Sequence, residues 1–296
     1  MCRWLMIRLM ITIWAASFAA TVCLAQSGDI HVPSTVLAGS DAAVSTNGTG
    51  KATFYLVGPG VSHKEDVSLG SEIHLRSQDL HNAGSYLAIV CSDICRGATF
   101  FVIPSQPASL TFLVHPSRVP VSQGDSVSGV VFPFDQFHNQ VFAPVSVGFQ
   151  LSAGKASLFS RAARTQNGVA WFRTTSGRSA GALQVVATLD NLSTRRVVQQ
   201  VASDPCNLRI NGQRTNAGIV VQTEPVHDCA GNPVPDGTIV SFTATEAIGK
   251  STVDAPIKQG VARALISPLA EASGGAIISA ASGVVMGNEV RVGAQP

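Results

Sequence analysis

The cysteines are the residues of this chain whose chemistry is easiest to predict. Behind an N-terminal apolar segment that resembles an export signal, four cysteines remain, and an even number in an exported chain favours disulfides over metal binding or catalysis. Four cysteines allow three pairings, and proximity in the sequence favours Cys91 with Cys95 and Cys206 with Cys229. The second pair would close a loop of about two dozen residues and stabilise its domain by roughly 3 kcal/mol in the chain-entropy model. The alternative is that these are free, buried thiols.

Most catalytic and metal-binding motifs are missing from the sequence. It contains no H-E-x-x-H, P-loop or C-x-x-C motif, and no D-x-D-x-D-G array for calcium. The histidines are scattered; His138 and His227 occupy comparable loops but not matched positions, and we interpret both as ordinary loop residues. We therefore expect no catalytic residue, no metal site and no cofactor.

Aromatic residues are the candidates for binding a partner. Several phenylalanines surround the segment 135–139, and Trp171 lies in a stretch whose alternation places it on an outward face. The phenylalanines could form a partner surface or pack against a neighbouring domain, and Trp171 could stack on a sugar or contact a sheet edge or another domain. The possible partner surface consists of Phe132, Phe134, Phe137, Phe142 and Trp171.

The elements that would position these residues are strands. In "DCAGNPVPDGTIVSFTA", residues 228–244, turn-forming residues are followed by strict alternation from Thr238. The first part cannot sustain a helix, and the second has the period of two expected where one face of a strand is buried. The inward set of this strand is predicted to be Val240, Phe242 and Ala244.

A variant of the same stretch occurs earlier in the chain. "DQFHNQVFAPVSVGFQL", residues 135–151, aligns with it when shifted by 93 positions, so that Asp135 matches Asp228 and Asn139 matches Asn232. The inward set of its strand is predicted to be Val147, Phe149 and Leu151. "QNGVAWF" and "KQGVARA" match at almost the same shift, as do "SAGALQVVA" and "SGGAIISAA". A period near 93 residues indicates two copies of one domain, close to the size of an immunoglobulin-like (Ig-like) sandwich.

The last of these copies resembles a known family. "DCAGNPVPDGTIVSFTA", followed by "QGVARALI" and "GGAIISAAS", is similar to the bacterial Ig-like domain of the invasin and intimin type; the middle copy matches more loosely, with Phe137 and His138 at positions where the family has small turn residues. The resemblance implies domains that form rods holding an adhesive tip away from a cell. We expect neither the outer-membrane barrel nor the lectin-like tip of those proteins in this chain.

The N-terminal part is predicted to be a third Ig-like unit. "NAGSYLAIV", residues 82–90, resembles the G-x-Y strand of Ig-like folds, in which a tyrosine hydroxyl bonds back across the preceding corner. Here Cys91 and Cys95 would staple a hairpin instead of joining two sheets. The fold class is therefore all-β, tandem Ig-like β-sandwiches, each of two antiparallel sheets, with a signal peptide in residues 1–25 and domains in 26–104, 105–203 and 204–296.

Charge and hydropathy limit the partners. The formal net charge is +2, and removal of the leader with Arg3 and Arg8 leaves it near zero, so no footprint for nucleic acid is present. The leader's apolar run is shorter than the roughly 20 residues of a membrane span, and no second such run follows, so we expect no membrane insertion after cleavage. A bacterial protein, secreted or in the cell envelope, is the expectation.

These features predict a protein that acts through surfaces and spacing. The leading prediction is an exported, non-enzymatic structural or adhesive protein, a spacer or cell-surface interaction module whose partner is a protein or glycan at a cell surface or envelope. The alternative is an accessory or binding subunit of an envelope filament or secretion assembly. An exported hydrolase is a third and weaker alternative.

Overall fold

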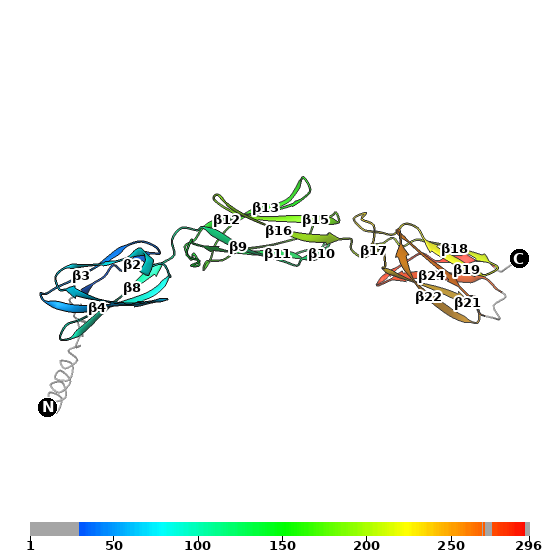
Figure 1. Ribbon diagram of the computed structural model, residues 1–296. Helices are drawn as coiled ribbons and strands as arrows, with labels where there is room; N and C mark the ends of the chain where they lie inside the picture. The colour runs from blue at the N-terminus through cyan, green and yellow to red at the C-terminus, as the bar shows by residue number, and fades with distance from the viewer. Residues whose placement is uncertain (1–29, 268, 270–273, 294–296) are drawn as a thin grey trace, which may run out of the picture. The chain divides into compact units, whose positions relative to one another are not determined.

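The computed structural model describes residues 30–267, 269 and 274–293, and the predicted signal peptide lies outside them. The described part is built of strands, apart from one 3-10 turn at Ser77–Asp79, η1 (Figure 1). The chain divides into two compact units, residues 1–103 and 104–296. The all-β fold class is confirmed. No helix in the described residues is long and apolar enough to cross a membrane.

The first unit is one sandwich of two sheets. The smaller sheet has the order β1 (Ile30–His31), β3 (Ala42–Thr46), β6 (Glu72–Leu75), and the larger has the order β2 (Thr35–Leu37), β8 (Cys95–Ile103), β7 (Gly84–Cys91), β4 (Lys51–Gly58), β5 (Val61–Ser68). Its core contains Phe54, Leu56, Tyr86 and Phe100, all 1% exposed or less. Cys91 and Cys95 are bonded across the end of the β7–β8 hairpin, which confirms the predicted staple.

The predicted tyrosine corner is present. Tyr86 is fully buried, and its hydroxyl donates to the carbonyl of Asn82 at 2.9 Å. Burial is the main reason why the pKa of this hydroxyl is raised; the bond to Asn82 acts in the opposite direction, and nearby Asp79 adds to the rise. The buried ring also stacks on Phe100, with a centroid distance of 5.4 Å.

Tyr86→Phe is expected to lower the free energy of unfolding of the first unit by about 1 kcal/mol, because it removes this hydrogen bond but keeps the ring. Urea unfolding of residues 26–296 followed by circular dichroism measures the change. The matched control is Tyr55→Phe, which alters a half-buried tyrosine on the outer face of the same unit. An equal effect of the two substitutions would contradict the corner assignment.

The second unit contains two sandwiches with separate cores. In the first, one sheet has the order β14 (Ala170–Thr174), β11 (Val127–Phe134), β9 (Ser109–His115), and the other has β10 (Arg118–Pro120), β16 (Leu192–Val201), β15 (Gly181–Leu189), β12 (Ser146–Ala153), β13 (Ala156–Arg164). We call it the middle sandwich. Val147, Phe149 and Leu151 are buried in its core, as the alternation predicted.

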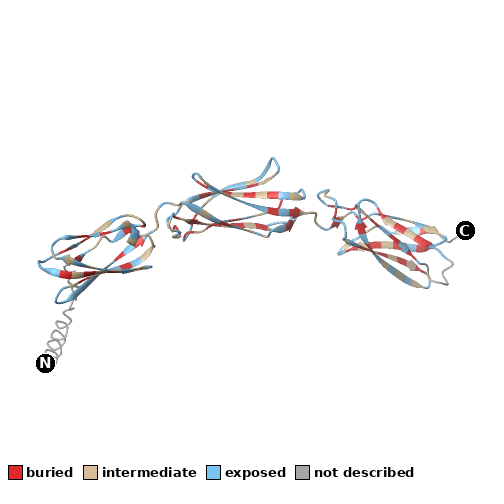
Figure 2. Cartoon of the chain, viewed as in Figure 1, coloured by how far each residue is buried: buried red, intermediate tan, exposed pale blue. Residues whose placement is uncertain are grey.

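The other sandwich of this unit, here called the last sandwich, has a continuous ladder. Its strands follow the order β18 (Ile210–Thr215), β19 (Gly218–Thr223), β23 (Val261–Ile266), β22 (Gly249–Lys258), β21 (Ile239–Glu246), β24 (Ala276–Ser282), β25 (Val285–Met286), with β26 (Val290–Val292) also on β24 and a short pair β17 (Pro205–Cys206) and β20 (His227–Asp228). Val240, Phe242 and Ala244 are buried, as predicted. Figure 2 shows buried and exposed residues alternating along the strands of each sandwich.

Two details differ from the predicted pair of antiparallel sheets. The short strands β2 and β10 pair in parallel with β8 and β16, because the first strand of each sandwich is split and its second part joins the opposite sheet. In the last sandwich, the end of β22 pairs with β23 through Ile257 and Lys258 and so links the two layers. Neither detail changes the alternation of side chains, which is why the sequence did not reveal them.

Candidate functional site

The repeated loop of the second unit forms the same hydrogen-bonded cluster in both sandwiches. In the last sandwich, one carboxylate oxygen of Asp228 accepts the backbone N–H groups of Ala230 at 2.9 Å and Asn232 at 2.8 Å. The other oxygen accepts the N–H of Ser203 at 3.1 Å and the side-chain amide of Asn232 at 3.0 Å. Asp228 is 4% exposed, so its carboxylate is buried, while the residues that donate to it are partly or fully exposed. We call it the Asp228 cluster.

The middle sandwich repeats this arrangement around Asp135, which is 1% exposed. One oxygen accepts the N–H groups of Phe137 and Asn139, each at 2.9 Å, and the other accepts the N–H of Ser105 at 3.0 Å and the side-chain amide of Asn139 at 2.9 Å. In both loops the carboxylate therefore fixes the turn and the segment that enters the sandwich. We call this the Asp135 cluster.

One cluster also reaches the preceding sandwich. The side-chain amide of Asn232 donates to the carbonyl of Arg178 at 2.8 Å, and its oxygen accepts the N–H of Ala180, also at 2.8 Å. The side-chain amide of Asn232 thus both donates to and accepts from the backbone of this segment, as a residue of a neighbouring β-strand would. Within the second unit, the last sandwich is thus joined to the loop before β15 by a two-point contact.

The clusters shift the pKa of their carboxylates. Burial acts to raise the pKa of Asp228, but the hydrogen bonds from Asn232, Ser203 and Ala230 favour the charged form more strongly, and the pKa is lowered. The pKa of Asp135 is lowered for the same reasons. Both groups are therefore ionised at neutral pH.

The lowered pKa values predict a loss of stability in acid. A carboxyl whose pKa is lower in the folded state stabilises that state above its ordinary pKa, and the contribution disappears as the pH falls through the folded value. Asp228→Asn is expected to cost about 1–2 kcal/mol at pH 6, because the second oxygen can no longer accept the N–H of Ser203. Urea unfolding at pH 6 and pH 2.5 should show a smaller difference between the variant and the unchanged chain in acid. A difference independent of pH would contradict the assignment.

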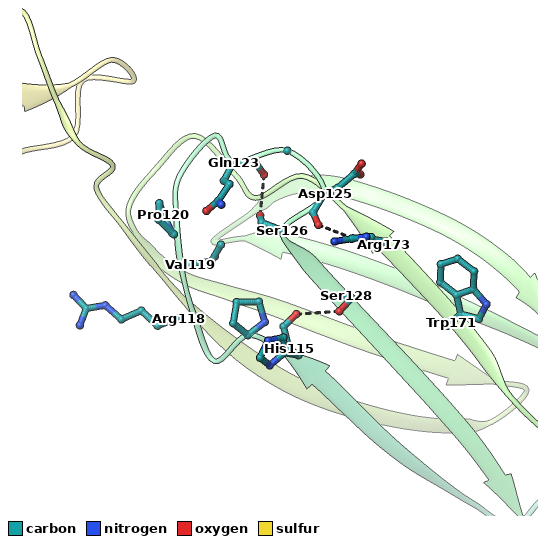
Figure 3. A pocket seen from close by; sticks show the side chains of 12 residues that line it. His115, Arg118, Val119, Pro120, Gln123, Asp125, Ser126, Ser128, Trp171 and Arg173 are labelled. Carbon is teal, nitrogen blue, oxygen red and sulfur yellow. Dashed lines mark hydrogen bonds between the residues drawn. The ribbon is translucent and has the colours of Figure 1, made fainter. Parts of the chain in front are cut away.

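A second candidate site is an open groove lined by the outer face of the β14–β11–β9 sheet and by β10 of the other sheet (Figure 3). It has a volume of about 530 Å³, which lies within the range of roughly 300–1,000 Å³ typical of small-molecule sites. Trp171 stands at one end and is 65% exposed, while Arg118 lies at the other end. The residues that line the groove are His115, Pro116, Arg118, Val119, Pro120, Gln123, Gly124, Asp125, Ser126, Ser128, Trp171 and Arg173.

Hydrogen bonds to the backbone hold the polar side chains of this groove. Nε of Arg173 donates to the carbonyl of Asp125 at 2.7 Å, and the hydroxyl of Ser126 donates to the carbonyl of Gln123 at 2.8 Å (Figure 3). The hydroxyl of Ser128 donates to the carbonyl of His115 at 3.3 Å. These bonds orient the side chains and leave hydroxyl oxygens able to accept and the terminal amino groups of Arg173 able to donate.

The predicted partner surface is divided among different places. Phe132 and Phe134 lie on the outward side of β11, the side that also carries Trp171 through its pairing with Val130. Phe137 is half-buried in the Asp135 loop, and Phe142 follows that loop and is 58% exposed. The structure therefore places Trp171 on the same face as Phe132 and Phe134 and leaves Phe137 and Phe142 in the loop. A role of these residues in binding a partner stays a prediction.

Other candidate residues were placed as follows. Cys206 and Cys229 are bonded, so both predicted disulfide pairings are confirmed. His138 and His227 are exposed in their loops, and among the described residues no group of three or more His, Cys, Asp or Glu is arranged to hold a metal ion. His138 has φ of 65°, where its counterpart in the other copy is Gly231.

Sequence reasoning missed the role of both aspartates and most of the groove. The matching Asp and Asn positions of the two repeats were the available signal for the clusters, but they were interpreted only as turn residues. Arg173 could have been placed beside Trp171 by alternation along the strand. The remaining groove residues come from other strands and turns and carry no local signal.

Comparisons with known proteins support the fold. No family model matches the chain, and no curated protein sequence matches it. Among solved structures, the Escherichia coli adhesin FdeC is similar over 90% of this chain and 97% of its own, with 13% identity and a TM-score of 0.61. Invasin, a bacterial integrin-binding protein, is similar over 90% of this chain, with 10% identity and a TM-score of 0.51. The chain spans 59% of that invasin structure. At these identities the likeness shows the fold alone, and it confirms tandem Ig-like β-sandwiches.

Proposed function

We propose that this chain is an exported structural and adhesive protein of the bacterial envelope or surface, without catalytic activity, in which successive Ig-like sandwiches present a binding surface at a distance. We also infer that residues 26–104, 105–203 and 204–296 are its three domains. The observation that carries the proposal is the repeated Asp cluster. A domain that served only as a compact binding unit would have no need to bind the segment that enters it in the same way in successive copies.

The clusters act on the connections between domains. The N–H groups of Ser105 and Ser203 belong to the segments that enter the two sandwiches, and each donates to a buried carboxylate. Asn232 adds the two hydrogen bonds to the middle sandwich. The connection between the middle and last sandwiches is therefore held from both sides and has little freedom to bend, which is what a spacer requires.

Small-angle scattering on residues 26–296 tests the spacer role. We expect a radius of gyration well above the roughly 18 Å that a single compact body of this length would have. Asn232→Ala should broaden the distribution of interatomic distances, because it removes the hydrogen bonds to Arg178 and Ala180. The control is Asn288→Ala, which should not broaden it, because the side-chain amide of Asn288 forms its hydrogen bonds with Ile210 inside the last sandwich. A compact profile would contradict the spacer role and favour an accessory binding subunit of an envelope assembly.

The adhesive part of the proposal has its own test. Purified residues 26–296, labelled with a fluorophore, are expected to bind to intact cells or extracellular matrix in a saturable manner and to be displaced by unlabelled protein. Capture only by components of the envelope from which the protein comes would contradict adhesion and support the accessory subunit. The partner is expected to be a protein or glycan at that surface.

A further inference from the structure

We propose that the groove beside Trp171 on the middle sandwich binds an acidic saccharide, with the pyranose ring against the indole and its carboxylate on Arg173. This inference goes beyond the spacer role and does not depend on it. It rests on the exposed aromatic ring, on the positive charge beside it and on the comparison with the other copy of the same domain.

The comparison between the two copies shows that the fold does not require this surface. In the middle sandwich, Trp171, Val130 and Leu113 lie side by side across three strands, with Trp171 65% and Leu113 57% exposed. The row at the matching positions of the last sandwich is entirely polar, consisting of Arg263, Gln222 and Asn211. There the guanidinium of Arg263 donates to the side chain of Gln222 at 2.7 Å. Apolar residues of the last sandwich, Val220 and Leu265, lie in the next row.

An exposed indole suits the apolar face of a sugar. The face of an aromatic ring carries negative charge density, which attracts the weakly positive C–H groups of a pyranose. Trp171 is the only tryptophan outside the predicted leader, and it lies on an antiparallel sheet between buried Ala170 and Phe172, which fix its strand. The ring is therefore presented on a rigid base.

The charges of the groove indicate an acidic ligand. Arg118 and Arg173 line it together with His115, and the one acidic side chain is that of Asp125. Figure 3 shows the carboxylate of Asp125 directed away from Ser128 and His115. Among the described residues, the terminal amino groups of Arg173 have no protein acceptor, so they can bind a carboxylate through paired hydrogen bonds.

The distance between Trp171 and Arg173 allows one ligand to contact both side chains. Trp171 and Arg173 are two positions apart on β14 and face the same side, which separates their Cα atoms by about 7 Å. A sugar ring stacked on the indole can place its carboxylate near the guanidinium over such a distance. Ser126, Ser128 and Gln123 then lie along the groove, where sugar hydroxyl groups can donate to or accept from them. A protein partner, in contrast, typically needs about 800 Å² on each side.

The first test follows ligand binding through the fluorescence of Trp171, the only tryptophan in residues 26–296. Trigalacturonate is titrated into residues 26–296 while the fluorescence of Trp171 is recorded, and its fully methyl-esterified form, which has the same rings without charge, serves as the matched ligand control. We expect trigalacturonate to change the fluorescence of Trp171 in a saturable manner, and we expect salt to weaken this binding. The ester should bind at least about tenfold more weakly. Absence of binding by trigalacturonate at millimolar concentration overturns the proposal. Equal binding of both forms overturns the assignment of an acidic ligand.

Variants measured by calorimetry locate the site. Trp171→Ala and Arg173→Gln are each expected to weaken binding about tenfold or more. Arg161→Gln, which removes an exposed charge from β13 in the other sheet of the same sandwich, should change it less than twofold. Both groove residues are exposed, and thermal unfolding checks that the variants stay folded. An equal loss with Arg161→Gln, or binding of a glutamate oligomer as tight as that of the saccharide, contradicts the proposal.

Discussion

Asp228→Ala is expected to lower the free energy of unfolding of the last sandwich by about 3 kcal/mol. The substitution removes a buried carboxylate that accepts the N–H groups of Ser203, Ala230 and Asn232 and the side-chain amide of Asn232. A buried donor left without an acceptor costs about 1–3 kcal/mol, and water entering the loop offsets part of the sum. Urea unfolding combined with hydrogen exchange, read on peptides from residues 204–293, measures the change and assigns it to this sandwich.

The control for this experiment lies in the same loop. Asp236 is exposed, and its one hydrogen bond, to the N–H of Gly260, is long at 3.4 Å. Asp236→Ala should therefore change stability by less than about 0.5 kcal/mol. Hydrogen exchange at Ser203, read on a peptide that spans this residue, should accelerate in the Asp228 variant alone. If both alanine variants destabilised the sandwich equally, the loop would be sensitive to any substitution and the Asp228 cluster would have no special role.

Replacing Cys206 and Cys229 together by serine is expected to cost roughly 3 kcal/mol of stability in the last sandwich. The bond closes a loop with a sequence separation of 23, and opening it restores conformational entropy to the unfolded chain. The Cys91–Cys95 bond has a separation of 4, so the matching double serine variant should cost only about 2 kcal/mol in the first unit. Urea unfolding in the absence of reductant measures both. A larger effect for the shorter loop would contradict the entropic explanation.

The two large effects are expected to be coupled. Cys206 lies on β17, which pairs with β20 at His227 and Asp228, and Cys229 directly follows Asp228. The disulfide and the carboxylate therefore hold the same entering segment against the same loop. Combining Asp228→Ala with the double serine variant should cost less than the sum of the separate losses, since each alone already loosens this contact.

This arrangement gives a physical reason for the turn-rich sequence of the repeated loop. A buried carboxylate is stable only when its oxygens accept several hydrogen bonds, and the tight turn from Asp228 to Asn232 supplies the nearest of them. The second oxygen of Asp228 also accepts the N–H of Ser203 and so holds the segment that enters the last sandwich. A loop of the same length without the aspartate could still turn, but it could not hold the connection.

The strands and their inward residues followed from the sequence alone. Alternation of apolar and polar residues is a local property, and it placed Phe149 and Phe242 in their cores because a strand exposes successive side chains on opposite faces. The two copies, the tyrosine corner and the disulfide pairs were also predictable, since each depends on residues that are close in the sequence or repeated at a fixed shift. The family resemblance added the type of domain.

The tertiary structure decided which distant residues come into contact in each copy of the repeated domain. Asp228 meets Ser203 across 25 positions, and Trp171 shares its groove with Arg118, which belongs to a different sheet. Contacts of this kind depend on how strands are ordered and paired, and a period of two residues does not encode that order. The sequence by itself determined which residues face inward and that the domain is repeated. Only the packing of the sheets determined which side chains meet, because that is set by contacts between distant segments of the chain.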